Sequence, residues 1–272
     1  MKCLRLFVCV IASCALTLSG SDSGAAIKLN LRTRVEAFKG SGDWQEAHFE
    51  KTLPIARTAI VICDMWDKHW CSGASRRVDA LAARMAPVVD AARSRGILII
   101  HAPSETLDFY KDSPQRQRML AVAKVAVPQP LPLTDPPLPI DDADGGCDTP
   151  DNFYKAWTRE NATLPIAPED AISDNGAEIY SLLRARGIEN LLVMGVHTNM
   201  CILNRTFAIK QMTKWGVRCV LVRDLTDSMY NPKDRPFVTH DRGTGLVIEH
   251  IEKYWAPTVL STDLVAALPQ AK

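Results

Sequence analysis

The sequence lacks an excess of charge of either sign, because 32 Lys and Arg residues stand against 31 Asp and Glu residues. Proteins that bind nucleic acid usually carry a basic excess, so this balance argues against that class of partner. Internal repeats, heptads and low-complexity tracts are also missing, which excludes solenoids and coiled coils. The 272 residues are enough for one large α/β domain or two small ones.

Long hydrophobic runs are missing except near the N-terminus. Residues 6–18 are apolar, follow two basic residues and precede a stretch of small residues. This pattern predicts a signal peptide over 1–26, because the apolar run is too short to span a bilayer comfortably. An uncleaved N-terminus and lipidation at Cys14 are the alternatives. We expect an exported protein, periplasmic or extracellular, with no membrane segment after cleavage and one domain over 27–272.

The remainder of the chain alternates between apolar strands and amphipathic helices. We expect strands over 58–63, 97–100, 191–196, 218–222 and 257–261, and helices over 78–95, 177–186, 200–215 and 243–254. Strand–helix–strand units of this length predict a parallel sheet with helices on both faces.

Two segments interrupt the alternation. Residues 27–32 alternate between apolar and polar side chains, which is typical of an edge strand. Residues 125–150 are rich in proline and end in an acidic, glycine-containing stretch. We interpret this insertion as a surface loop over the sheet edge. An interdomain linker is the alternative.

Polar residues follow the strands at the edge where open parallel sheets bind ligands. Asp64 follows the first strand of the predicted sheet, and Cys201 lies where the strand over 191–196 gives way to a helix. A helix N-terminus stabilises a thiolate and offers N–H groups to an oxyanion. A nearby Asp64 could take the proton of the thiol. The alternative is a buried structural cysteine.

Two motifs resemble the signatures of a known superfamily. Val-Ile-Cys-Asp-Met-Trp-Asp at 61–67 and Gly-Val-His-Thr-Asn-Met-Cys at 195–201 are similar to those of the isochorismatase-like cysteine hydrolases, which include nicotinamidases and N-carbamoyl amide hydrolases. The resemblance covers about 55–262 and implies a three-layer, Rossmann-like and usually oligomeric fold. It also implies Cys201 as nucleophile, Asp64 as general base, a cis peptide before His197, and an oxyanion hole from the backbone N–H groups of His197 and Cys201.

The sequence departs from this family where a catalytic lysine is expected. That lysine precedes the helix that begins near Gly176, but residues 166–170 contain none. Lys155 and Arg159 are the nearest upstream cations. Arg159 could supply a fixed charge, although a guanidinium does not exchange its proton as a lysine can. The alternatives are that a loop brings in Lys155, or that hydrolysis is lost.

The family's nicotinamidases bind a metal through an Asp-x-His motif that is missing here. His69, His101 and Glu105 would form a weaker ligand set. We therefore expect no metal and no other cofactor, and nicotinamide is not the expected substrate.

Several side chains near the strand ends are candidates for contacts with a small-molecule substrate. Trp66 could form an apolar wall, and His69, His101 and Asn199 could supply polar contacts. Arg205 lies one helical turn after Cys201, where it could bind a carboxylate. An exposed helix arginine is the preferred interpretation.

Five of the eight cysteines follow the predicted signal peptide, so an oxidising compartment leaves at least one thiol free. Cys71 and Cys147 both lie in predicted loops and can pair, which would anchor the proline-rich segment near the site. Cys63 and Cys219 lie inside strands, where we expect buried free thiols.

These patterns together predict an exported cysteine hydrolase that cleaves a C–N bond in a small amide or carbamoyl compound through a Cys201 thioester. An isochorismatase-type vinyl-ether hydrolase is the second interpretation, and a catalytically silent ligand-binding protein is the third. We expect a homo-oligomer.

Overall fold

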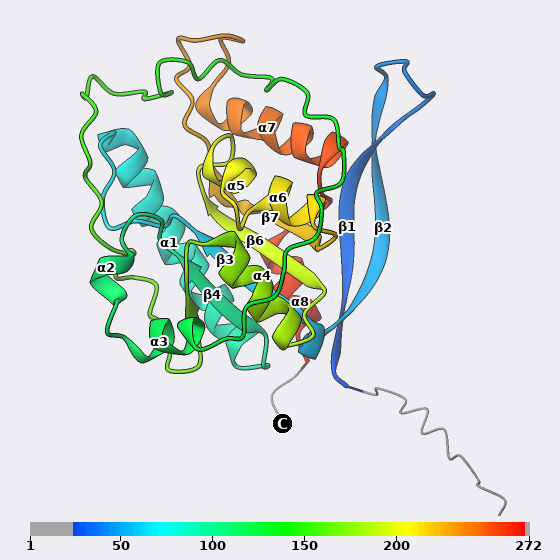
Figure 1. The fold of residues 1–272 in the computed structure, drawn as a ribbon. Helices are drawn as coiled ribbons and strands as arrows, with labels where there is room; N and C mark the ends of the chain where they lie inside the picture. Colours follow the sequence, from blue (N-terminus) through cyan, green and yellow to red (C-terminus); the bar gives the residue numbers. More distant parts are fainter. Residues whose placement is uncertain (1–23, 270–272) are drawn as a thin grey trace, which may run out of the picture.

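The structure is a computed structural model that describes residues 24–269 (Figure 1). The predicted signal peptide therefore lies almost entirely outside the described residues. Among the described helices, none combines the length and the apolar composition needed to cross a bilayer.

One eight-stranded sheet runs through the described part of the chain, in the order β2-β1-β8-β7-β6-β3-β4-β5. Its parallel part contains β3 (Thr58–Cys63), β4 (Leu98–Ala102), β5 (Ala171–Ile172), β6 (Asn190–Val196), β7 (Arg218–Asp227) and β8 (Thr258–Val259). Strands β3 and β6 are buried along their whole length, which explains why both read as continuous apolar runs.

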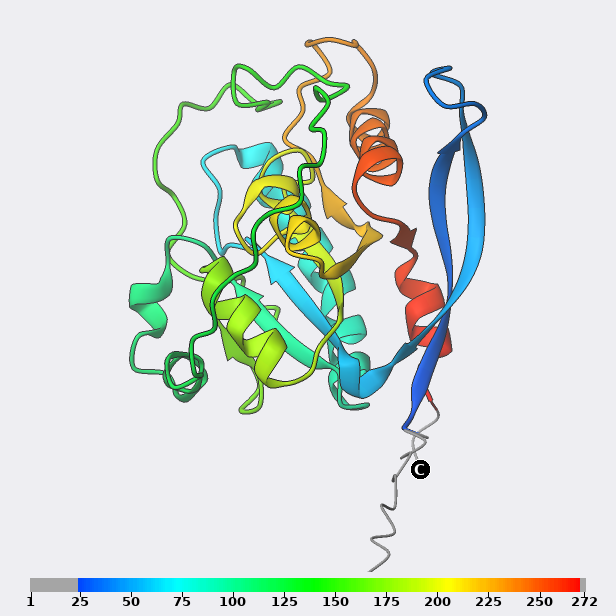
Figure 2. The same ribbon diagram turned by 45° about the vertical axis from the view of Figure 1, so that its right-hand side comes forward.

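An antiparallel hairpin of β1 (Ala26–Glu36) and β2 (Trp44–Pro54) completes the sheet (Figures 1 and 2). The prediction of an edge strand at 27–32 is wrong in one respect. Strand β1 is paired on both sides, with β2 along its length and with β8 at Arg32, so β2 is the edge. The alternation in β1 arises because Ile27 and Leu29 point into the core.

Helices cover both faces of the sheet, which confirms the predicted three-layer architecture. The helical segments are η1 (Ile55–Arg57), α1 (Ser72–Arg93), α2 (Leu107–Tyr110), α3 (Pro114–Leu120), α4 (Gly176–Ala185), α5 (Cys201–Asn204), α6 (Ile209–Lys214), α7 (His240–Tyr254) and α8 (Ser261–Ala267). Helices α4 to α7 pack into one apolar cluster, and α1, α8 and the hairpin pack into the other.

The single helix predicted over 200–215 is two short helices, α5 and α6. The chain leaves α5 at Arg205, which has an extended backbone conformation. Thr206 then packs against the start of α4, where its hydroxyl accepts a hydrogen bond from the Gly176 N–H at 2.9 Å. A Cβ on Gly176 would lie 2.1 Å from the Thr206 carbonyl oxygen, so glycine permits this close approach. A tertiary contact thus overrides the helical periodicity.

Residues 121–170, here called the strap, contain no helix and no strand beyond one isolated bridge. The loop is therefore longer than the 125–150 insertion predicted from proline content. Backbone hydrogen bonds tie the strap to the end of α6 at Leu131 and to Met65 after β3 at Asn161. Figure 1 shows the strap as the green trace that passes α7 and returns toward α2.

The packing of α7 against Tyr230 gives a test of the core. A Cβ on Gly243 would lie 2.2 Å from the ring of the fully buried Tyr230. We expect Gly243→Ala to lower the free energy of unfolding by about 2 kcal/mol or more in urea denaturation, because the core must shift. Gly245→Ala is the matched control in the same helix, where the nearest atom is the flexible end of Arg242. It should be neutral or stabilise by up to about 1 kcal/mol. Equal effects of the two substitutions would contradict this account.

Candidate active site

Asp64 follows β3 and lies fully buried at the carboxyl end of the sheet. Its Oδ1 accepts a hydrogen bond from the Ser104 N–H at 2.8 Å, and its Oδ2 accepts one from Arg205 Nε at 2.9 Å. Its backbone has a φ of 49°, in the left-handed region that non-glycine residues seldom occupy. Burial raises the pKa of Asp64, and the Arg205 charge opposes that rise.

Cys201 opens α5, and its thiol lies so close to the Asp64 carboxyl that each group shifts the pKa of the other. Burial and the Asp64 charge together raise the pKa of the Cys201 thiol far above its ordinary value. Both effects favour the protonated thiol over the thiolate. Helix α5 spans only Cys201–Asn204, so it is much shorter than the helix expected over 200–215.

Arg205 is the cation that pairs with Asp64. It also reaches the exposed Glu105, with Nη2 at 3.3 Å from Oε1, so it bridges the buried site and the surface. Although burial alone would lower the pKa of Arg205, the Asp64 charge raises it above its ordinary value. The exposed-helix interpretation of Arg205 is wrong, because α5 ends there and the side chain turns to Asp64.

The two cations proposed from the sequence are engaged elsewhere. Lys155 Nζ donates to the Glu105 carbonyl oxygen at 3.1 Å. Arg159 lies 3.9 Å from Asp67, and its guanidinium covers the ring of Phe109. The signal that could have identified Arg205 is its four-residue spacing from Cys201, which places it near the thiol.

The turn between β6 and α5 has the geometry that the family resemblance implies. The Val196–His197 peptide is cis. The backbone of His197 forms a hydrogen bond that lowers the pKa of Cys201, opposing the larger effect of burial. The His197 carbonyl oxygen accepts hydrogen bonds from the N–H groups of Met200 and Ile202. The turn therefore places the His197 backbone beside the sulfur.

Aromatic side chains from three segments pack against one another beside His197. Trp66 stacks on Trp157 with ring centroids 4.5 Å apart, and its Nε1 donates to the Ser104 carbonyl oxygen. His69 stacks on Trp157 and meets His197 edge-on at 4.9 Å. Burial lowers the pKa of His69 to about 4 and that of His197 to about 3, so both rings are neutral at neutral pH. Trp157 comes from the strap and was not identified from the sequence.

Two residues proposed for substrate contacts have structural partners instead. His101 is fully buried, with Nδ1 at 2.7 Å from Glu160 and Nε2 at 3.1 Å from Asp170. The Asn199 amide donates to Asp142 and exchanges hydrogen bonds with the backbone of Met229. Both side chains therefore hold the strap rather than face a ligand.

The predicted disulfide between Cys71 and Cys147 is present, with the two Cα atoms 5.7 Å apart. Cys63 and Cys219 are buried free thiols, as predicted. Cys201 remains unpaired, as a nucleophile requires.

The ligand set suggested for a weak metal site is not brought together within residues 24–269. His101 is enclosed by two carboxylates, and Glu105 faces Arg205 at the surface. The one cluster of at least three ligating groups in this range is Cys71, Cys147 and Asp148. Its two sulfurs are joined in the disulfide, so it offers no thiolate to a metal.

Comparisons with known proteins identify the fold. No family model and no curated protein matches the sequence. A cysteine hydrolase from Pseudomonas syringae pv. phaseolicola superposes with a TM-score of 0.52 and 16% identity, over 79% of this chain and 94% of that one. This chain has the fold of that cysteine hydrolase. The match confirms the α/β architecture that the two motifs predict.

Isochorismatase family proteins are also similar in structure. One from Burkholderia thailandensis matches with a TM-score of 0.46 and 19% identity, over 78% of this chain and 96% of that one. One from Desulfovibrio vulgaris subsp. vulgaris matches with a TM-score of 0.46 and 18% identity, over 79% of this chain and 99% of that one.

The buried His101 predicts how the free energy of unfolding depends on pH. Burial disfavours the charged ring, but Glu160 and Asp170 raise the pKa of His101 to about 9. Because this pKa exceeds the ordinary value of about 6.5, the stabilisation is complete below about pH 6.5 and is lost as the pH rises toward 9. We expect the free energy of unfolding to fall by up to about 3 kcal/mol across this window. His101→Gln should remove that dependence in urea denaturation, and an unchanged slope would contradict the assignment.

Proposed function

We propose that this protein is an exported cysteine hydrolase that cleaves the C–N bond of a small amide or carbamoyl compound. The proposal needs no cofactor and no nucleic acid. The observation that carries it is the contact between the Cys201 thiol and the buried carboxyl of Asp64, whose charge Arg205 balances. A nucleophile, a base within reach and a fixed countercharge are the elements that acyl transfer requires.

In the first half-reaction the Cys201 sulfur attacks the carbonyl carbon while the thiol proton moves to Asp64. The backbone N–H groups of His197 and Cys201 are the donors we assign to the resulting oxyanion. Asp64 then returns the proton to the leaving nitrogen, the C–N bond breaks, and a thioester remains on Cys201.

In the second half-reaction water attacks the thioester and gives a proton to Asp64. The C–S bond breaks, the acid product leaves, and Asp64 reprotonates the sulfur. Arg205 keeps its own proton throughout, because a guanidinium is not deprotonated in proteins. Its role is to hold Asp64 ionised in a buried setting, which makes the carboxylate available as a base.

Export is supported by the Cys71–Cys147 disulfide, since such bonds persist in oxidising compartments. The predicted signal peptide over 1–26 agrees with it. Assembly into a homo-oligomer remains a prediction.

A second candidate function is ligand binding without turnover. The observation in its favour is that the cation beside Asp64 is an arginine, which cannot exchange a proton as the family's lysine can. The two functions differ in what they require of the Cys201 sulfur.

Thiol labelling distinguishes these functions. We expect iodoacetamide to alkylate Cys201 in the folded protein, because Asp64 can accept the thiol proton as the sulfur reacts. Asp64→Asn should slow the reaction at least about tenfold, measured by mass spectrometry of the Cys201 peptide. Asp108→Asn, which changes an exposed acid in α2, is the matched control. A Cys201 that is labelled only after unfolding would favour the silent binding protein over the hydrolase.

The charge on Arg205 should affect how the rate of this alkylation depends on pH. Removing it in Arg205→Met should raise the pKa of Asp64, because burial would no longer be opposed. The acidic limb of the rate profile should then move to higher pH by about one unit or more. Arg205→Lys keeps the charge and should restore most of the wild-type profile. Identical profiles in all three proteins would show that Arg205 does not act on Asp64.

A further inference from the structure

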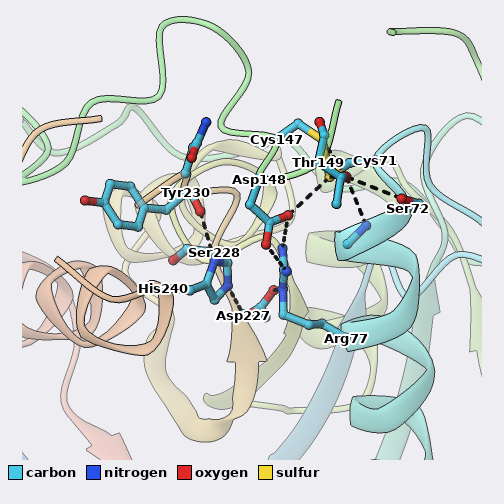
Figure 3. Close-up of polar contacts among 12 residues, drawn as sticks. Cys71, Ser72, Arg77, Cys147, Asp148, Thr149, Asp227, Ser228, Tyr230 and His240 are labelled. Carbon is cyan, nitrogen blue, oxygen red and sulfur yellow. Dashed lines mark hydrogen bonds and ion pairs between the residues drawn. A yellow bond between two sulfur atoms is a disulfide. The ribbon is translucent and has the colours of Figure 1, made fainter. Parts of the chain in front are cut away.

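Arg77 lies on α1 between two carboxylates from distant parts of the chain. Its Nη1 is 2.6 Å from Asp148 Oδ2 in the strap, and its Nε is 2.9 Å from Asp227 Oδ2 at the end of β7. Figure 3 shows the guanidinium between these two side chains, with His240 on the other side of Asp227. The proposed reaction does not use any of these groups.

On the strap side, the network is anchored to the start of α1. Asp148 follows Cys147, whose disulfide joins it to Cys71 at the N-cap of α1. The first N–H groups of α1 donate to the Asp151 carboxylate and the Thr149 hydroxyl, at 2.8 and 3.3 Å. These contacts cap the helix, so the strap and α1 form one connected unit at this point (Figure 3).

On the sheet side, the network reaches the turn that carries Cys201. The Asp227 carbonyl oxygen accepts a hydrogen bond from the Thr198 N–H at 2.8 Å, and Asp227 pairs with Val196 across the sheet. His240 Nε2 lies 2.8 Å from Asp227 Oδ1, which holds the carboxylate from α7. The residue that Arg77 holds is thus bonded to the turn between the cis peptide and the nucleophile.

We propose that Arg77 is a positioning residue, which holds the Asp227 end of β7 and through it the backbone turn that presents the His197 and Cys201 N–H groups. This inference rests on the proposed function, because it assigns to Arg77 the alignment of the oxyanion donors. Such donors work only when they are held within about 0.5 Å of the productive geometry. Arg77 does not touch the substrate or the sulfur.

The geometry around Arg77 allows this role to be separated from folding. A cavity of about 270 Å³ borders Arg77, Asp227 and Arg84 between α1 and α7. Truncation of Arg77 therefore leaves a space that water can enter rather than a dry void. Asp227 keeps its contact with His240 in the variant.

Two electrophiles distinguish alignment of the oxyanion donors from simple access to the thiol. Acylation of Cys201 by p-nitrophenyl acetate passes through an oxyanion and releases p-nitrophenolate in a burst, whereas alkylation by iodoacetamide forms no oxyanion. We expect Arg77→Met to slow the acylation burst about tenfold, since removing one such donor outright costs more than this. Alkylation of the same sulfur should change by less than about twofold, and the ratio of the two rates is the measurement.

Three variants complete the experiment. Arg84→Met removes an exposed arginine from the same helix and should leave both rates unchanged. Arg77→Lys should restore part of the acylation rate, because an ammonium keeps the positive charge but lacks the planar set of donors with which the guanidinium contacts both carboxylates. Cys201→Ser lacks the thiol and measures the background release of p-nitrophenolate.

Each result decides the proposal. A fall in acylation alone supports Arg77 as a positioning residue. Equal falls in both rates, or no fall in either, would overturn it while leaving the proposed hydrolase intact. A wild-type protein that gives no acylation burst at Cys201 overturns the hydrolase itself, and the role of Arg77 falls with it.

Discussion

The buried carboxylate of Asp64 is the constraint on which the candidate site depends. An ionised group without exposure to water costs several kcal/mol unless a countercharge and hydrogen bonds compensate it. Arg205 and the Ser104 N–H supply both. Arg205 makes this contact from the point where the chain leaves the helical path directly after α5.

The strap meets a second constraint, since a long segment without regular structure loses much conformational entropy when it is ordered. A disulfide and contacts between titratable side chains hold it in place. The disulfide at Cys147, the ion pair of Asp148 with Arg77 and the contact of Glu160 with His101 fix it at successive points. It also brings Trp157 into contact with the rings of Trp66 and His69, so the strap contributes to the packing around the candidate site.

The features that could be predicted from the sequence rest on local or shared signals, whereas the others depend on contacts between distant parts of the chain. The buried strands, the positions of Asp64 and Cys201 and the disulfide could be predicted, because apolar runs, motifs and paired loop cysteines are local or shared signals. The partners of His101 and the role of Arg205 could not. Both depend on which distant carboxylate a side chain meets after folding, and a helical periodicity over 200–215 concealed the change of direction at Arg205.

The cation beside Asp64 is Arg205, and a guanidinium does not exchange its proton, so it cannot act as an acid or a base. His69 and His197 have a pKa near 4 and 3, and His101 is enclosed by carboxylates. Within the described residues, Asp64 is therefore the carboxyl beside the sulfur to which we assign proton transfer. In the proposed reaction this one carboxyl acts as base in each attack and as acid in each departure. The proposed amide or carbamoyl substrate is compatible with that limit, because its leaving nitrogen needs a single proton.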